Sequence, residues 1–159
     1  MLVGVIADTH GLLRPEALEA LRGVDHILHA GDVGEIGILE RLQEIAPVTA
    51  IRGNVDTEGE CAELPLTEML EMGGCFVYMV HAREWLDIVP TAAGVRLVVC
   101  GHSHVAGVEE QDGVVYLNPG SAGPRRFKLA VTVARVRIEG GVVAAEIVEL
   151  GRQSVGSSE

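Results

Sequence analysis

The chain has 159 residues, of which 48% are hydrophobic and 22% are charged, so it is long and apolar enough for one folded domain with at most a short tail. A second full domain and wholesale disorder are excluded on the same grounds. The net charge of −11 would repel a nucleic-acid backbone, and one Trp, two Tyr and two Phe are too few for a base-stacking surface, so we expect no stable nucleic-acid partner.

The first half of the chain alternates between apolar runs and segments with helical spacing. Three apolar runs predict buried strands, and two segments between them predict helices: Leu2–Ala7, His26–Ala30 and Val48–Arg52 as strands, Pro15–Arg22 and Ile36–Ala46 as helices. Alternating strands and helices imply right-handed crossovers. We therefore expect a parallel sheet that is covered on both faces.

The second half predicts further strands and two hairpins. The apolar runs are Cys75–Val80 and Leu97–Cys100; the hairpins turn at Asp112-Gly113, between Gly107–Gln111 and Val114–Asn118, and at Gly140-Gly141, between Leu129–Glu139 and Val142–Leu150. We expect these strands to form a second, largely antiparallel sheet that packs on the first, and a short helix over Glu84–Val89. We expect one domain over residues 1–150 and a flexible tail over 151–159.

Chemically capable side chains follow five of the predicted strands, at the points where the strands end. They are Asp8 and His10 after the first strand, Asp32 after the second, Asn54 after the third, His81 after 75–80, and His102 and His104 after 97–100. Each residue alone has an ordinary interpretation as a turn, a cap or a buried polar group. Their coincidence at strand ends, where ligands bind in open α/β sheets, favours a functional site.

These seven oxygen and imidazole donors, with no thiolate among them, suit divalent transition-metal ions. Seven donors are too many for one ion that keeps open positions, and they fit two ions that share one bridging carboxylate. Two such ions can hold a bridging hydroxide at neutral pH and clamp the oxygens of a phosphoryl group. The pattern therefore predicts hydrolysis of a small phosphate-ester substrate. We expect two Mn²⁺ ions, with Fe, Ni, Co or Zn as alternatives.

The order of the motifs carries a family resemblance. Asp-x-His at 8–10, Gly-Asp at 31–32, Gly-Asn-x-Asp at 53–56, a strand-end His at 81, Gly-His-x-His at 101–104 and Asn-Pro-Gly-Ser at 118–121 follow one another along the chain. This series resembles the calcineurin-like metallophosphoesterase family, in its small single-domain bacterial and archaeal phosphodiesterase branch. The resemblance implies an α/β fold, a four-layer αββα sandwich of two mixed β-sheets flanked by helices, with a dinuclear site between its loops.

The resemblance also implies roles for individual residues. Asp8, His10 and His104 would hold one ion, Asn54, His81 and His102 the other, and Asp32 would bridge them. We assign catalysis to Asp32, Asn54 and His102, and substrate binding to Asn54, Ser121 and Arg125. Ser121 as a simple turn cap, and Arg125 with Arg126 as a solvated pair, stay open as alternatives. Asp56 is a turn residue or orients a histidine, His26 and His29 are structural, and Trp85 shapes the cleft or covers core.

One departure from the family pattern bears on the substrate. Larger phosphomonoesterases of the family usually have a His directly after the Asn of Gly-Asn, where it can protonate a leaving group, and this chain has Val55 there. Without that acid, alkyl monoesters are poor substrates and diesters are favoured. We therefore expect a metal-dependent phosphodiesterase. The alternatives are a phosphomonoesterase of the same family and a non-catalytic scaffold with the same fold, as in the retromer subunit that this fold resembles.

The expected location is the cytoplasm. No apolar run reaches the ~18 residues that cross a bilayer, and the N-terminal sequence MLVGVIADTH lacks the features of an export signal. Cys61, Cys75 and Cys100 are odd in number and lack CxxC spacing, which fits reduced thiols. We expect no membrane contact and leave a homo-oligomer open.

Overall fold

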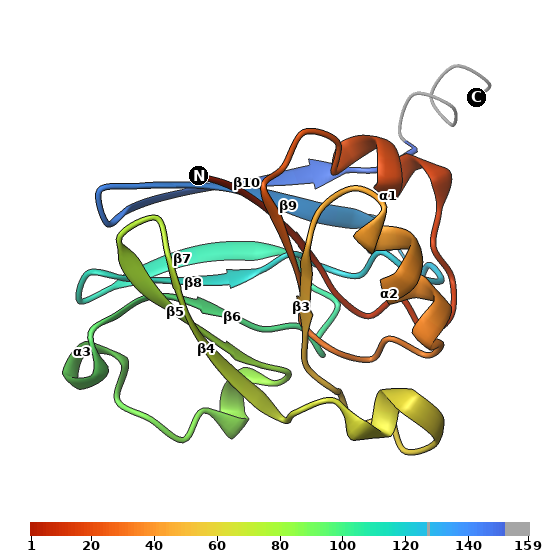
Figure 1. Cartoon of the computed structure of the whole chain (residues 1–159), viewed down its shortest axis with the longest axis horizontal. Helices are drawn as coiled ribbons and strands as arrows, with labels where there is room; N and C mark the ends of the chain where they lie inside the picture. The colour runs from red at the N-terminus through yellow and green to blue at the C-terminus, as the bar shows by residue number, and fades with distance from the viewer. Residues whose placement is uncertain (127, 152–159) are drawn as a thin grey trace.

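Two five-stranded sheets lie face to face in the computed structural model, which describes residues 1–126 and 128–151 (Figure 1). The strand order is β10-β9-β1-β2-β3 in the first sheet and β4-β5-β6-β8-β7 in the second. Both sheets contain parallel and antiparallel pairs. The predicted sandwich of two mixed sheets is therefore confirmed.

The first sheet is built on the predicted alternation of strands and helices. Its elements are β1 (Leu2–Ile6), α1 (Pro15–Ala20), β2 (His26–His29), α2 (Ile36–Gln43), β3 (Val48–Ala50), β9 (Thr132–Glu139) and β10 (Val142–Glu149). Strands β1, β2 and β3 are parallel, and α1 and α2 cover the outer face with an apolar layer that includes Leu21 and Leu42. The hairpin β9–β10 pairs antiparallel with β1. Its prediction as part of the second sheet is wrong, because β9 completes the first sheet on the free edge of β1.

The second sheet contains β4 (Thr67–Met72), β5 (Cys75–Val80), β6 (Val95–Val99), β7 (Gly107–Gln111) and β8 (Val114–Asn118). The three central strands β5, β6 and β8 are parallel, and only the outer strands β4 and β7 pair antiparallel. The prediction of a largely antiparallel second sheet is therefore wrong. Strand β4 is absent from the sequence prediction because its residues, TEMLEM, contain only one β-branched side chain.

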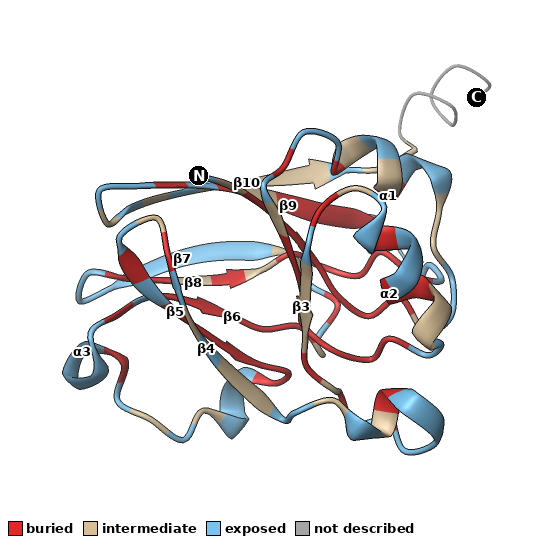
Figure 2. Ribbon diagram, in the orientation of Figure 1, coloured by how far each residue is buried: buried red, intermediate tan, exposed pale blue. Residues whose placement is uncertain are grey.

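The inner faces of the two sheets share one core, and the buried strands run through the middle of the molecule (Figure 2). The outer face of the second sheet is covered differently, by the segment that follows β5. A 3-10 helix η2 (Arg83–Trp85) and one turn α3 (Pro90–Ala93) belong to that segment, in place of the predicted helix over Glu84–Val89. Leu86 and Ile88 pack beside Tyr78 in alternation, and the residue before Pro90 is extended, which is why a helix does not form there.

A second 3-10 helix, η1 (Gly59–Glu63), connects β3 to β4. Among the residues described, no helix has the length and apolarity to cross a membrane, and the longest, α2, has 8 residues. The predicted tail over 151–159 lies outside the described residues from 152 onward, so the domain boundary at 150 stays a prediction. The loops after β1, β2, β3, β5 and β6 converge at one edge of the sandwich, where backbone hydrogen bonds such as Asp8 N–H to Gly31 O (2.9 Å) and Gly101 N–H to His81 O (2.8 Å) join them.

Candidate metal centre

Six of the seven predicted ligand residues form two adjacent groups at this edge. Asp8, His10 and His104 make the first group, and Asp32, His81 and His102 the second. Within each group the possible ligand atoms all lie within 4.8 Å of one another. The groups draw on the loops after β1, β2, β5 and β6, so both sheets contribute to the centre.

Asp8 is fully buried, and its two carboxylate oxygens have different surroundings. Oδ2 accepts a hydrogen bond from the His102 backbone N–H at 3.0 Å. Oδ1 faces three imidazoles, at 3.9 Å from His10 Nε2, 3.7 Å from His81 Nε2 and 3.7 Å from His104 Nε2. One oxygen therefore fixes the side chain, and the other points into the centre.

Asp32 repeats this arrangement. Its Oδ1 accepts a hydrogen bond from the Val55 backbone N–H at 2.9 Å. Its Oδ2 lies 3.2 Å from His81 Nε2 and 3.6 Å from His10 Nε2. Because His10 and His81 belong to different groups, this oxygen lies between the two groups.

The orientation of His81 makes the centre suited to a cation. Its Nδ1 lies 2.7 Å from the carbonyl oxygen of Ala30, which can only accept, so Nδ1 carries a proton. In the neutral form of His81 that binds a metal, the lone pair of Nε2 is directed at Asp8 Oδ1 and Asp32 Oδ2. Asp8 Oδ1, His10 Nε2 and His81 Nε2 are buried and form no hydrogen bond. A divalent ion would satisfy all three atoms, so the residues fit the metal that the motif pattern predicts.

Backbone strain is concentrated in the same residues. Non-glycine residues with positive φ are Asp8 (57°), His10 (48°), Asp32 (58°), His102 (73°), His104 (66°) and, in the β7–β8 turn, Asp112 (54°). Five of these six described residues thus belong to the two groups. Left-handed backbone costs a non-glycine residue about 1–3 kcal/mol, and it is retained mainly at functional sites. The surrounding structure holds these loops in the conformation that brings the side chains together.

Glycines that precede the ligand residues allow the close approach of the loops. A Cβ at Gly101 would lie 2.8 Å from Asp8 Oδ2, and one at Gly31 would lie 2.6 Å from His81 Nδ1. Gly53 packs in the same way against Asp32. No role was predicted for these glycines, although a glycine stands before Asp32, Asn54 and His102 alike.

Burial and mutual interaction shift the protonation of the centre. Burial raises the pKa of Asp8 to about 7, and the negative charge of Asp32 adds to the effect. Burial alone would raise the pKa of Asp32 and lower that of His81. The close approach of the two side chains, the Val55 N–H on Asp32 and the Ala30 carbonyl on His81 reverse both directions. Burial lowers the pKa of His104 to about 4. The metal-free centre therefore shares protons among its carboxylates and imidazoles, and a bound cation would displace them.

Asn54 and Val55 lie at the exposed mouth of the centre. Asn54 Oδ1 lies 3.1 Å from His102 Nδ1, which places the seventh predicted ligand beside the second group. Val55 is 45% exposed. The position after Asn54 therefore presents an apolar side chain to solvent.

The other two of the three predicted substrate contacts, Ser121 and Arg125, lie elsewhere. Ser121 is buried and donates its hydroxyl to the backbone carbonyl of Asp8 at 3.1 Å, so it supports the loop after β1. Arg125 is exposed and donates Nε to the carbonyl of Leu129 at 3.3 Å. The positive charge of its neighbour Arg126 acts on the centre. Burial is the largest cause of the lowered pKa of His104, and the charge of Arg126 is the second. The structure thus brings neither Ser121 nor Arg125 into the centre.

Other polar residues singled out in the sequence support the loops. Asp56 accepts hydrogen bonds from the backbone N–H groups of Val33 (3.1 Å), Gly34 (3.1 Å) and Gly53 (2.9 Å), so it ties the loops after β2 and β3 together and does not orient a histidine. His29 is fully buried between Thr9 and the Gly31 N–H. Its structural role is confirmed, as is that of His26, which bonds Thr49 Oγ1 at 2.8 Å. Cys61, Cys75 and Cys100 are free and buried.

The chain belongs to the calcineurin-like phosphoesterase superfamily: residues 1–141 match the domain of that superfamily. The family resemblance read from the motifs is thereby confirmed, and the protein is a metallophosphoesterase by family. A curated relative, a "probable metallophosphoesterase" of Methanothermobacter thermautotrophicus, is 35% identical, and the match covers 95% of this chain and 94% of the relative.

Solved structures have the same fold. An archaeal protein described as a novel phosphodiesterase has a TM-score of 0.76 at 22% identity, with 93% of this chain and 100% of that chain covered. Vps29 of Entamoeba histolytica, solved in complex with Zn²⁺, has a TM-score of 0.71 at 25% identity, with 94% and 99% covered. The fold is therefore shared by a protein described as an enzyme and by Vps29.

Proposed function

We propose that this protein is a phosphodiesterase that works with two divalent transition-metal ions. The observation that supports this most strongly is the position of Asp32 Oδ2, 3.6 Å from His10 Nε2 and 3.2 Å from His81 Nε2, between the two groups of ligand atoms. In this proposal Asp8, His10 and His104 hold one ion, Asn54, His81 and His102 hold the other, and Asp32 contacts both. Mn²⁺ is the proposed ion, and Fe, Ni, Co and Zn ions suit the same donors.

Bound ions would supply Lewis-acid polarisation of phosphoryl oxygens and activation of water at neutral pH. The chain supplies a preformed set of ligand atoms. The backbone N–H groups of His102 and Val55 each hold one carboxylate oxygen, and the Ala30 carbonyl holds the His81 ring. Because these partners are backbone groups of short strand-end loops, the ligand atoms need little rearrangement to bind an ion.

The mouth of the centre supports a preference for diesters. Asn54 lies beside the second group, and the positive charge of Arg126 lowers the pKa of His104 in the first group. Diesters and monoesters are both anionic, so Arg126 would attract either, and the preference for diesters rests on Val55. Val55 cannot protonate a departing oxygen, so leaving groups that depart as stable anions, such as aryl oxygens, are favoured over alkyl alcohols.

Two alternatives make different predictions. A phosphomonoesterase of the same family would need an acid that protonates the leaving group. The position expected for that acid, directly after Asn54, is occupied by Val55, which cannot donate a proton. A non-catalytic scaffold is suggested by the similarity to Vps29. The full set of ligand types in this chain, and the unpaired buried atoms Asp8 Oδ1, His10 Nε2 and His81 Nε2, favour the enzyme. A cytoplasmic location remains part of this proposal, and a homo-oligomer remains open.

A substrate screen tests the proposal. Protein purified without chelator is analysed for metal and assayed with bis-p-nitrophenyl phosphate, p-nitrophenyl phosphate and glycerol phosphate. We expect the diester to be cleaved fastest, with activity lost after chelation and restored by Mn²⁺. Faster cleavage of glycerol phosphate would favour the phosphomonoesterase, and metal-loaded protein that cleaves none of the three esters would favour the scaffold.

A further inference from the structure

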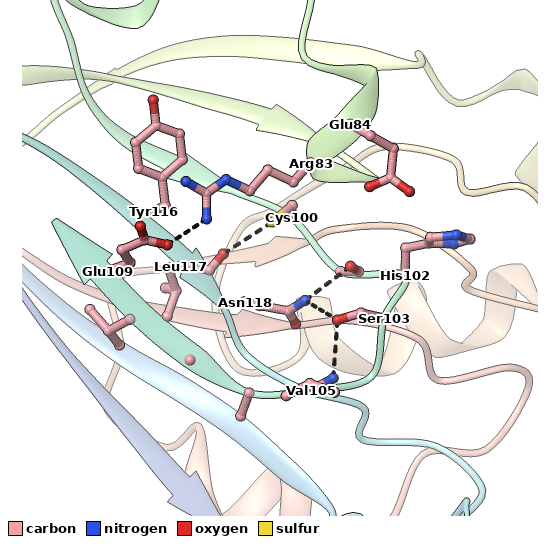
Figure 3. A pocket seen from close by; sticks show the side chains of 14 residues that line it. Arg83, Glu84, Cys100, His102, Ser103, Val105, Glu109, Tyr116, Leu117 and Asn118 are labelled. Carbon is pink, nitrogen blue, oxygen red and sulfur yellow. Dashed lines mark hydrogen bonds and ion pairs between the residues drawn. The ribbon is translucent and has the colours of Figure 1, made fainter. Parts of the chain in front are cut away.

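A pocket of about 410 Å³ lies beside the metal centre (Figure 3). His102 forms part of its wall, so the pocket adjoins the second group of ligands. Arg83 and Glu84, from the turn after His81, lie across the pocket from Ser103 and Val105 (Figure 3). Small-molecule pockets usually measure about 300–1,000 Å³, so this one has room for a group as large as one nucleoside but not for an oligonucleotide.

The charges on the pocket wall do not favour a second phosphate. Arg83 Nη1 donates to Glu109 Oε1 at 2.7 Å, and its guanidinium lies 4.2 Å from the centre of the Tyr116 ring, so Glu109 neutralises its charge (Figure 3). Glu84 has no such partner on the wall and adds one negative charge. The pocket therefore suits an uncharged arm of a substrate better than an anionic one.

An exposed aromatic ring, that of Trp85, lies next to His81 and His102 of the second ligand group. Trp85 is 45% exposed, and its ring centre lies 6.0 Å from that of His81 and 5.7 Å from that of His102. The 3-10 turn that contains it is fixed by a hydrogen bond from the Trp85 N–H to the carbonyl of Ala82 (2.9 Å), and Ala82 is fully buried. Trp85 thus offers a flat, positioned face at the end of the centre where the pocket lies.

We propose that one arm of the substrate is a single nucleoside, whose uncharged base stacks on Trp85 beside the pocket that Glu84 lines. This inference rests on the proposed diesterase function and narrows it to nucleoside phosphodiesters. The base supplies a planar face that stacks on Trp85. A nucleoside arm without a further phosphate is not repelled by the carboxylate of Glu84. Stacking of one base on an aromatic side chain is worth on the order of a 10-fold gain in affinity.

The fluorescence of Trp85 tests this directly, because the chain has one Trp. Zn²⁺-loaded protein is titrated with adenosine 5′-(methyl phosphate), a diester with one base, and with glycerophosphocholine, a diester from phospholipid with a cation and no ring. We expect saturable quenching by the adenosine diester, and a Kd on the order of 10-fold lower than that of glycerophosphocholine. Absence of quenching, or tighter binding of glycerophosphocholine, would overturn the inference.

Variants separate stacking from general damage. By calorimetric titration, Trp85→Ala should weaken binding of the adenosine diester on the order of 10-fold, and Trp85→Phe should recover most of the loss. Phe76→Ala is the matched control, because Phe76 is also an exposed ring, 41% accessible, but lies near the opposite end of β5 from His81. It should leave the Kd unchanged. Equal losses in Trp85→Ala and Phe76→Ala would contradict the inference.

The charge of Glu84 gives an independent check. An adenosine diester that carries an additional 3′-phosphate should bind more weakly than the plain diester, and Glu84→Gln should narrow the difference. A preference for the additional phosphate would contradict this part of the inference. If bis-p-nitrophenyl phosphate is not cleaved but Trp85 is quenched, the proposed diesterase function fails and the nucleoside site stands. If the diester is cleaved and Trp85 is not quenched, the nucleoside site alone fails.

Discussion

Replacement of Asp32 by Asn removes the negative charge that lies between the two groups of ligand atoms. The Asp32 oxygens have separate tasks, since Oδ1 accepts the Val55 N–H and Oδ2 faces His81 and His10. An amide can keep the first contact, but it cannot offset the repulsion of two cations. Asp32→Asn should therefore weaken both metal sites, whereas a variant of His10 affects chiefly one.

The size of the effect follows from the chemistry of the ions. Lewis-acid activation contributes several kcal/mol to catalysis, and each ~1.4 kcal/mol corresponds to a 10-fold change in rate. Loss of about 3–5 kcal/mol gives a decrease on the order of 10² to 10⁴ in kcat/KM at saturating metal. The metal-free fold should survive. Asp32 attracts His81 and repels Asp8, so its neutralisation removes one stabilising and one destabilising interaction, and we expect the Tm to change by less than about 5 °C.

The assay pairs diesterase rate with metal against thermal unfolding without it. Asp25→Asn is the matched control, because Asp25 also accepts one backbone hydrogen bond, from the Leu2 N–H at 2.8 Å, but faces no imidazole. Near-normal activity of Asp32→Asn would refute the bridging role. Unfolding of the metal-free variant would instead assign Asp32 to the stability of the fold.

Three further predictions concern the mouth, the loops and the core. Val55→His should raise cleavage of alkyl monoesters relative to bis-p-nitrophenyl phosphate, because an imidazole after Asn54 can protonate the leaving oxygen; an unchanged ratio would contradict this. Asp56→Asn should lower the stability of the metal-free protein by about 2–3 kcal/mol, measured by urea unfolding, because an amide cannot accept the three backbone hydrogen bonds that Asp56 accepts; an unaltered midpoint would show that the loops hold without it. Burial lowers the pKa of His29 from 6.5 to about 4, so protonation of the unfolded chain should cost the metal-free protein stability as pH falls from 6.5, by about 2 kcal/mol at pH 5. His29→Gln should lose that part of the pH dependence. If the free energy of unfolding changes with pH in the same way in both proteins, His29 is not the group responsible.

The sequence predicted the local elements better than their assembly. The strand and helix alternation up to β3 follows from apolar periodicity, and the two predicted hairpins, β7–β8 and β9–β10, follow from Gly-containing turns. Which sheet a hairpin joins is not a local property: β9 pairs with β1 more than a hundred residues away, and nothing in the turn at Gly140-Gly141 specifies that partner. Strand β4 shows the same limit, because its weak strand propensity is overridden by pairing with β5 along its whole length.

For the metal centre, the sequence predicts which residues meet but not how their side chains are oriented. Asp, Asn and His at the ends of parallel strands could be predicted to meet, because such ends converge at one edge of a sheet. The orientation of the side chains could not be predicted. It depends on backbone groups of other loops, such as the Val55 N–H on Asp32 and the Ala30 carbonyl on His81. Ser121, predicted to bind substrate, donates its hydroxyl inside the fold to the Asp8 carbonyl, a contact that no local sequence signal indicates.

The number of metal ions tests the central claim most directly. Anomalous scattering from crystals of the Mn²⁺-loaded protein, together with elemental analysis in solution, counts the ions on each chain. We expect two, one beside Asp8, His10 and His104 and one beside His81 and His102, with Asp32 in contact with both. A single ion at saturating metal, or two ions of which only one contacts Asp32, would contradict the two-metal centre.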